Sequence, residues 1–577
     1  MRSALLAFFC CAAIACRTPP AAPASAAPAA GTPGERPGPA ATPPAAGKPV
    51  SAPAAASPAA APSSSDRVTL VFAASTAGQL VPCGCSPDQR GGLPRAVAYV
   101  RKLRSEIPNF LYADAGDLLF ESAAPPPAQM LTQRQLKARV LARGDDLLLA
   151  AARVVGRRDL VLGAAFVAET AGEVPLLDAG ASTRGARASV LVHAGAVPVG
   201  LFAAGLGENP QQTIAARARA LRAEGARLVV LLLQPAADNG FGAAQALVPA
   251  AREAGVDLIV LGKRDDPASD PDRKDASSPP VLAPEGQGQS LLRIDLQLGA
   301  GPVYLARGAG EKSGELRALD ERIARFQKQA EDNPSRRAAL LAKVRELVQR
   351  KAAAKDAVES VPDGATIATV TFVPLDNKLP DDAEAKQLVD GYDARVAQLN
   401  LEEAKSQPAA CPKARRGEAS FVGAQRCVSC HATEALFWEK TNHARAFATL
   451  VGVNKQFSLD CIRCHVSGWQ QPGGVCRIDR AGFGGPGIGE GQKFGVGRQD
   501  VQCESCHGAG SKHVDDPPEH IDGKVAVNVC LRCHEASNSP HFDDAKYRPF
   551  VIGPGHGMPL ARGDKPHPLA PGKGPLH

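Results

Sequence analysis

Cys503-Glu504-Ser505-Cys506-His507 is one of four Cys-x-x-Cys-His segments in this sequence of 577 residues, and the others occupy residues 427–431, 461–465 and 530–534. This spacing is typical of covalent attachment of c-type haem. Two intervening residues let both sulfurs reach the two vinyl groups of one porphyrin, and the following histidine lies under the iron as its proximal ligand. The sequence therefore predicts four haem c groups. Their attachment residues are Cys427, Cys430, Cys461, Cys464, Cys503, Cys506, Cys530 and Cys533, and their proximal ligands are His431, His465, His507 and His534.

A zinc site is the main alternative for these segments, because two Cys-x-x-Cys pairs can build a zinc ribbon. A zinc ribbon does not require a histidine directly after every second cysteine. All four segments have that histidine. The pattern therefore favours haem over zinc.

The second axial position of each iron is expected to be filled mainly by histidine. A methionine ligand would raise the potential, but only Met558 of the three methionines lies in this part of the sequence. Bis-histidine ligation with low potentials is therefore the expected majority state. The histidines available besides the proximal ones are His443, His513, His520, His541, His556, His567 and His577.

Residues 421–557 resemble the cytochrome c-554 family of tetrahaem electron carriers. The matching stretches include Phe421-Val422-Gly423, Thr441-Asn442-His443-Ala444, residues 502–513 and the segment from Tyr547 to His556. The resemblance implies that the distal ligands are His443, His513 and His556, so one of four irons has an open or weakly held sixth site. His520 or His541 could fill that site or lie at the surface, and His567 and His577 are expected to be solvated in a Pro/Gly-rich tail.

Residues 66–310 alternate between buried strands and helices. Strands are expected at 68–74, 109–113, 228–233 and 257–261, and helices at 94–105, 131–152, 211–223 and 243–254. This alternation predicts a layered α/β fold.

The same region resembles the metallophosphatase domain of the 5'-nucleotidase family, which is a four-layer sandwich, through Gly78-Gln79-Leu80, Gly91-Gly92-Leu93 and the segment Asp114-Ala115-Gly116-Asp117. The resemblance implies that Asp117 matches one metal ligand. The other ligand segments are replaced by Ser75-Thr76-Ala77, Gly163-Ala164-Ala165, Gln234 and Gly262-Lys263-Arg264-Asp265. Two metal ions need several histidine and carboxylate ligands, so we expect no phosphatase activity.

Further domain boundaries follow from composition. We expect a helical spacer with one strand at 311–405, with a helical hairpin over 315–355, a strand at 366–374 and a helix at 383–401. A linker at 406–418 precedes a mostly α, haem-cored domain at 419–557, and a disordered tail follows at 558–577. The roles of Cys83, Cys85, Cys411 and Cys476 stay open, since an oxidising compartment allows several pairings.

The N-terminus predicts export. Residues 1–16 have a short positive start and an apolar core too short to span a bilayer, and they end in Ala13-Ile14-Ala15-Cys16, which resembles a lipobox. Cys16 would then be the lipidated first residue of the mature chain. Residues 17–65, rich in Ala and Pro, would form a disordered tether. We therefore expect a membrane-anchored lipoprotein that faces the periplasm or the cell surface.

These features favour one function over two others. The net charge of +7 is mild and accompanies no RNA-binding motif, so nucleic acid is not an expected partner. We expect an electron carrier that exchanges electrons with other redox proteins, with the α/β domain as a non-catalytic docking scaffold. The alternatives are an oxidoreductase acting on a small nitrogen or sulfur compound at a five-coordinate haem, and a phosphoesterase with a cytochrome regulator.

Overall fold

The computed structural model describes residues 66–82, 89–180, 182–205, 209–234, 240–262, 278–305, 319–320, 322–327, 329–331, 337–356, 363–408, 410–479, 497–518, 520–521, 523–535, 538–539 and 542–559. Several predicted features lie outside these residues. They are the signal segment with Cys16, the tether, Cys83, Cys85, residues 263–265, His541, and His567 and His577 of the tail.

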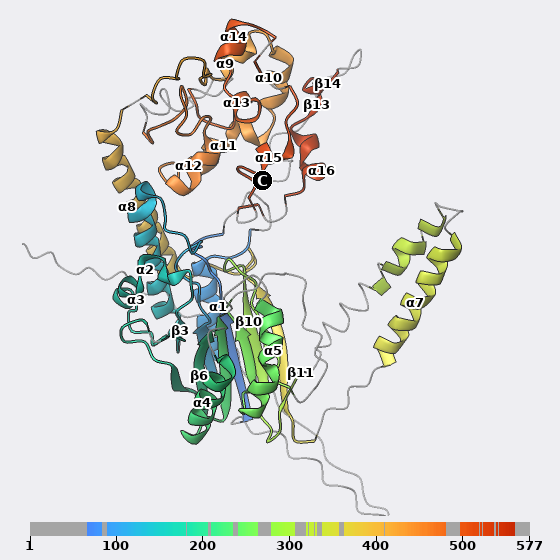
Figure 1. The fold of residues 1–577 in the computed structure, drawn as a ribbon. Helices are drawn as coiled ribbons and strands as arrows, with labels where there is room; N and C mark the ends of the chain where they lie inside the picture. Colours follow the sequence, from blue (N-terminus) through green and yellow to red (C-terminus); the bar gives the residue numbers. More distant parts are fainter. Residues whose placement is uncertain are drawn as a thin grey trace, which may run out of the picture. The chain divides into compact units, whose positions relative to one another are not determined.

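Two β-sheets form the α/β region (Figure 1). The seven-stranded sheet has the order β11-β12-β10-β1-β2-β3-β4, and the five-stranded sheet has the order β5-β6-β7-β8-β9. Strands β1 to β4 are parallel, as are β6 to β9. The bounds are β1 (Arg67–Ala73), β2 (Phe110–Asp114), β3 (Arg153–Val154), β4 (Leu176–Leu177), β5 (Ser189–Ala194), β6 (Val197–Gly205), β7 (Leu228–Gln234), β8 (Leu258–Leu261), β9 (Val281–Leu282), β10 (Ser290–Gln297), β11 (Val303–Leu305) and β12 (Thr366–Pro374).

Helices cover the outer face of each sheet. They are α1 (Leu93–Glu106), η2 (Ala128–Met130), α2 (Leu131–Leu147), η3 (Asp159–Leu162), α3 (Ala164–Glu169), α4 (Pro210–Ala223) and α5 (Gly240–Glu253). Side chains alternate between the two faces of a strand, so Leu70 and Phe72 of β1 join the core between the sheets. Val71 joins the core under α1 and α2. Leu231 of β7 packs with α4 and α5. The predicted four-layer α/β sandwich is confirmed.

Strand β12 belongs to the large sheet, where it pairs antiparallel with β10 along the whole of Ser290–Gln297. The sheet therefore extends beyond the boundary expected at residue 310, because a strand distant in sequence completes it. The expected helical segment before β12 is present as α7 (Arg337–Asp356) and as helical residues within 319–331.

Helix α8 (Ala383–Ser406) contributes to two hydrophobic cores. It begins at Asp382, whose carboxylate accepts a hydrogen bond from the backbone N–H of Ala385. Val389 and Val396 pack in the core under α1 and α2, whereas Ala404 packs with residues of the C-terminal region, including Ile462. At 1.5 Å per residue the helix is about 36 Å long. It is a shared structural element rather than a spacer.

The C-terminal region is mostly helical, as predicted, but its helices are four to seven residues long. Helices this short are not stable alone. Among the described residues, the hydrophobic cluster of this region has only seven buried members, one of which is Ala404 of α8. The region therefore needs another source of core. The elements are α9 (Ala424–Val428), α10 (Ala432–Trp438), η5 (Asn442–Arg445), α11 (Ala446–Gly452), α12 (Leu459–His465), α13 (Cys503–His507), α14 (Ser511–Asp515), α15 (Val527–Cys530), α16 (Asp544–Tyr547), η6 (Arg548–Phe550), β13 (Gly553–Pro554) and β14 (Gly557–Met558).

Cys411 and Cys476 form a disulfide with a sequence separation of 65 residues. The sequence had left this pairing open.

Replacing both residues with serine is expected to lower the free energy of unfolding by about 2–4 kcal/mol, because the crosslink restricts the unfolded chain. Denaturant titration of oxidised protein tests this, and an unchanged midpoint would contradict it. Reductant should lower the midpoint of the parent chain but not that of the double variant.

None of the helices among the described residues has the length and apolar character needed to cross a membrane.

Candidate functional site

A large cavity of about 2440 Å³ is lined mainly by the C-terminal region, with further residues from α8 and the α/β region. Ordinary small-molecule sites have volumes of about 300–1,000 Å³, so this space suits several large groups. Its walls include every predicted attachment cysteine, every predicted proximal histidine and the three predicted distal histidines. These are Cys427, Cys430, Cys461, Cys464, Cys503, Cys506, Cys530, Cys533, His431, His465, His507, His534, His443, His513 and His556.

Each Cys-x-x-Cys-His segment forms one helical turn. In the first segment, the backbone N–H groups of Cys430 and His431 both donate to the carbonyl oxygen of Cys427, at 3.1 and 2.9 Å. In the fourth segment, Cys533 and His534 donate in the same way to Cys530. The second and third segments lie within α12 and α13. The turn therefore gathers two thiols and one imidazole in the same place four times.

The eight cysteines are free thiols, as thioether formation requires. The Cys427 thiol is hydrogen-bonded with that of Cys503, and the resulting pKa of Cys427 is well above its usual value. The Cys464 thiol is hydrogen-bonded in the same way with that of Cys533. The fold thus brings the first segment beside the third, and the second beside the fourth.

Three pairs of histidine rings lie at nearly equal separations, and each pair joins one predicted proximal histidine to one predicted distal histidine. The ring centres are 6.2 Å apart for His431 and His513, 6.2 Å for His443 and His534, and 6.3 Å for His507 and His556.

These separations fit an iron ion between the rings. A metal–imidazole bond is about 2 Å long, and the ring centre lies about 1 Å beyond the nitrogen. Two imidazoles on opposite sides of one iron therefore have centres about 6 Å apart. The residues present fit bis-histidine haem at three positions.

His465 has a different environment. Its Nδ1 lies 2.6 Å from the carbonyl oxygen of Ala446, which leaves Nε2 as the ligating nitrogen. Burial lowers the pKa of His465 and so favours the neutral imidazole that a metal needs. Among the described residues, no second histidine ring is paired with it.

His520, one of the two residues suggested for a fourth distal position, is exposed and does not line the cavity. Its Nε2 lies 3.6 Å from a carboxylate oxygen of Asp516. The other suggested residue, His541, lies outside the described residues.

In the α/β region, the side chains at the strand ends that the resemblance aligned with metal-ligand segments make contacts within the protein. The Ser75 hydroxyl donates to the carbonyl oxygen of Gly262 at 2.6 Å, and the Gln234 amide donates to the carbonyl oxygen of Ala115. The Asp117 carboxylate accepts from the backbone N–H of Arg158 at 2.8 Å and lies 3.8 Å from its guanidinium. Within the described residues, no group of three or more His, Cys, Asp or Glu side chains could hold a metal ion.

The segment beside Asp117 is one that sequence reasoning missed. Gly156 and Arg158 both lie in the short segment between β3 and η3. A Cβ added at Gly156 would lie 2.3 Å from a carboxylate oxygen of Asp117. Gly163, which the resemblance suggested for this place, precedes α3 instead. In the sequence, Gly156 directly after a short buried strand was the signal that could have identified this segment. The guanidinium of Arg158 therefore lies beside the Asp117 carboxylate, the residue that the resemblance suggested as a metal ligand.

Residues 426–508 match the family model described as Cytochrome c554 and c-prime. This segment is similar to cytochrome c-554. The cytochrome c-554 of Nitrosomonas europaea is 33% identical over 108 residues, which are 16% of this chain and 40% of that relative. The predicted resemblance of this segment to the cytochrome c-554 family is confirmed. The chain spans 40% of the length of this curated relative.

Solved structures similar to the chain include two nucleotidases. The 5'-nucleotidase precursor from Thermus thermophilus has a TM-score of 0.38 and 16% identity, and the match covers 67% of this chain and 68% of that one. The NAD nucleotidase of Haemophilus influenzae has a TM-score of 0.37 and 11% identity, with 62% and 64% covered.

Proposed function

We propose that this protein transfers electrons through four covalently attached haem c groups. The observation that carries the proposal is the set of three histidine pairs with ring centres 6.2–6.3 Å apart inside a cavity lined by all eight motif cysteines. Four haems would also supply the core that the short helices of this region lack.

The chain's residues divide into three roles. Each pair of cysteines anchors one haem, and the histidine that follows is its proximal ligand. His513, His443 and His556 are the distal ligands opposite His431, His534 and His507. The bound haems would supply one-electron redox centres, whose bis-histidine ligation favours low potentials. The protein holds and orients these groups.

The cellular setting is proposed to be extracytoplasmic. The Cys411–Cys476 disulfide supports an oxidising compartment, and the predicted lipidation of Cys16 would anchor the chain to a membrane facing the periplasm or the cell surface. Redox proteins that donate and accept electrons would be its partners. The α/β region would be a non-catalytic scaffold, because Arg158 engages the remaining carboxylate.

His465 supports a second candidate, an oxidoreductase acting on a small nitrogen or sulfur compound. Its haem would have an open sixth position, since no paired histidine is described for it. Turnover of nitrite, hydroxylamine or nitric oxide well above that of free haem would favour this candidate over a carrier.

Production in a host that matures c-type cytochromes tests the main proposal. Intact mass and pyridine haemochrome spectra should show four haems per chain. Electron paramagnetic resonance should show three low-spin haems and one high-spin haem. Colourless protein, or protein that holds zinc in place of iron, would overturn the proposal.

A further inference from the structure

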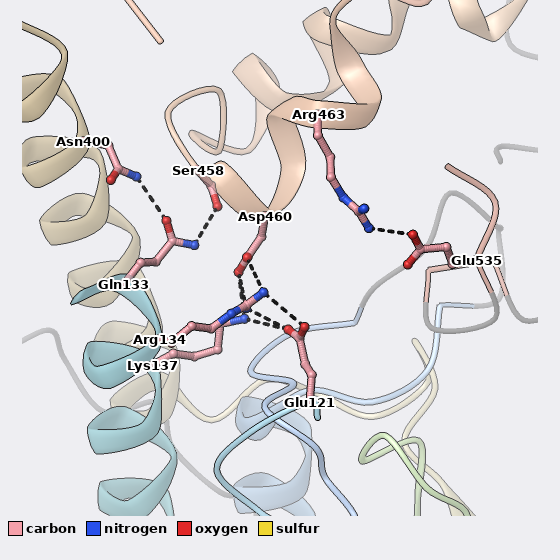
Figure 2. A network of polar contacts seen from close by, with 9 residues as sticks. All are labelled: Glu121, Gln133, Arg134, Lys137, Asn400, Ser458, Asp460, Arg463 and Glu535. Carbon is pink, nitrogen blue, oxygen red and sulfur yellow. Dashed lines mark hydrogen bonds and ion pairs between the residues drawn. The ribbon is translucent and has the colours of Figure 1, made fainter. Parts of the chain in front are cut away.

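A network of charged side chains joins the α/β region to the C-terminal region (Figure 2). Arg134 and Lys137 lie on α2, and each places a nitrogen 2.8 Å from a carboxylate oxygen of Asp460 on α12. Glu121 completes the network, with its Oε1 2.7 Å from Arg134 and 3.3 Å from Lys137. The two cations are thus shared between two acids.

The contacts around Asp460 are largely shielded from solvent, whereas the Glu121 side chain is 42% exposed. The exposed fractions of the side chains are 10% for Lys137, 17% for Arg134 and 21% for Asp460. Burial alone would raise the pKa of Asp460, but Lys137 and Arg134 outweigh burial and hold it below its usual value. Such a pair is screened less by salt than an exposed one, and removing one partner leaves an uncompensated charge.

Neutral and charged contacts from α8 lie beside the network. The Asn400 amide donates to the carbonyl oxygen of Phe457 at 2.8 Å and to the side-chain oxygen of Gln133 at 3.1 Å. Lys455 lies 3.4 Å from Asp393. The described residues of the two regions belong to one compact unit. The contact between the two regions is therefore built from several independent interactions.

The network meets the C-terminal region next to a haem-attachment site. Asp460 lies in the first turn of α12 and directly precedes Cys461. The same helix ends at His465, the motif histidine without a described histidine partner. Helix α8 also forms part of the cavity wall, through Asp393, Ala394 and Ala397.

We propose that the α/β region acts on this chain's own cytochrome region. Arg134 and Lys137 hold Asp460, position α12, and set the potential of the haem attached through Cys461 and Cys464. This inference rests on the proposed function. It gives the α/β region a role within the same chain, in which Arg134, Lys137 and Asp460 are positioning residues.

Opposite charge changes provide the test. Because reduction adds an electron, Asp460→Asn removes a nearby negative charge and should raise the potential of this haem. Lys137→Met removes a positive charge and should lower it. Each shift should change the reduction equilibrium by about threefold or more. The double variant should return close to the parent value. A redox titration that follows the high-spin haem signal measures these shifts.

Two controls separate charge from damage to the fold. Arg139→Met removes a cation from the same helix, but from a pair with Glu169 whose side chains are 43% and 64% exposed, so it should leave the potential nearly unchanged. Lys137→Arg keeps the charge and should retain the parent potential. If the Asp460→Asn protein does not accumulate in the host, the potentials of the two Lys137 variants and of the Arg139 control still test the inference.

The outcomes distinguish this inference from the proposed function. Protein without haem would overturn the proposed function. Protein with four haems but no shift, or with shifts of the same sign in both single variants, would overturn the inference alone. Opposite shifts with full haem content would support both.

Discussion

Replacing both Cys503 and Cys506 with serine is expected to remove one haem from the protein and to disorder its surroundings. The segment forms the five-residue helix α13, which is too short to be stable by itself. The Cys503 thiol also contacts Cys427 of the first segment, so the loss should loosen that segment too. The pyridine haemochrome signal per chain should fall by about a quarter, given one covalent haem per motif, and the mass should fall by one haem.

One single variant and a distant pair of cysteines serve as controls for this experiment. Cys506→Ser alone leaves one thioether and should retain part of the third haem. Replacing Cys411 and Cys476 removes two cysteines of the disulfide and should leave all four haems attached. Full haem content in the Cys503/Cys506 double variant would show that this segment is not an attachment site.

Replacing His443 with alanine is expected to convert one low-spin haem to a high-spin haem. The His443 ring centre lies 6.2 Å from that of His534, the separation expected across one bis-histidine iron. Without His443, that iron would lose its sixth ligand, and the axial ligands strongly influence the potential. Electron paramagnetic resonance should change from three low-spin haems and one high-spin haem to two of each.

His520→Ala is the matched control for His443→Ala. His520 is also a histidine of the C-terminal region, but it is exposed and does not line the cavity. Its removal should leave the spin states unchanged. If His520→Ala produced a new high-spin signal and His443→Ala did not, the pairing of His443 with His534 would be wrong.

The proposed haem-attachment segments are readable in the sequence because their chemistry is local. Five consecutive residues supply two thiols and one imidazole, and one helical turn brings them together wherever the segment lies. The strands of the α/β region were similarly readable, since β7 is a continuous apolar run that is almost wholly buried. The retained Asp117 was also visible in the sequence, but its contact with Arg158 was not.

Identifying the proposed distal ligands required more than the spacing of residues within a motif. His513 and His556 follow different motifs from those they face, and seven non-proximal histidines were available in the C-terminal part of the sequence. The family resemblance reduced that set to three residues. Only the folded chain shows which proximal histidine each one faces.

The sequence by itself carried the signals for the proposed haem-attachment segments and for the strands, because covalent haem binding depends on neighbouring residues and strand formation depends on local apolar patterning. Only the tertiary structure decided which residues contact one another across the chain. It paired the histidines, joined Cys411 to Cys476, placed β12 in the large sheet and brought Lys137 to Asp460. These contacts join residues far apart in sequence, so they depend on how the whole chain packs and leave no periodic signal along it.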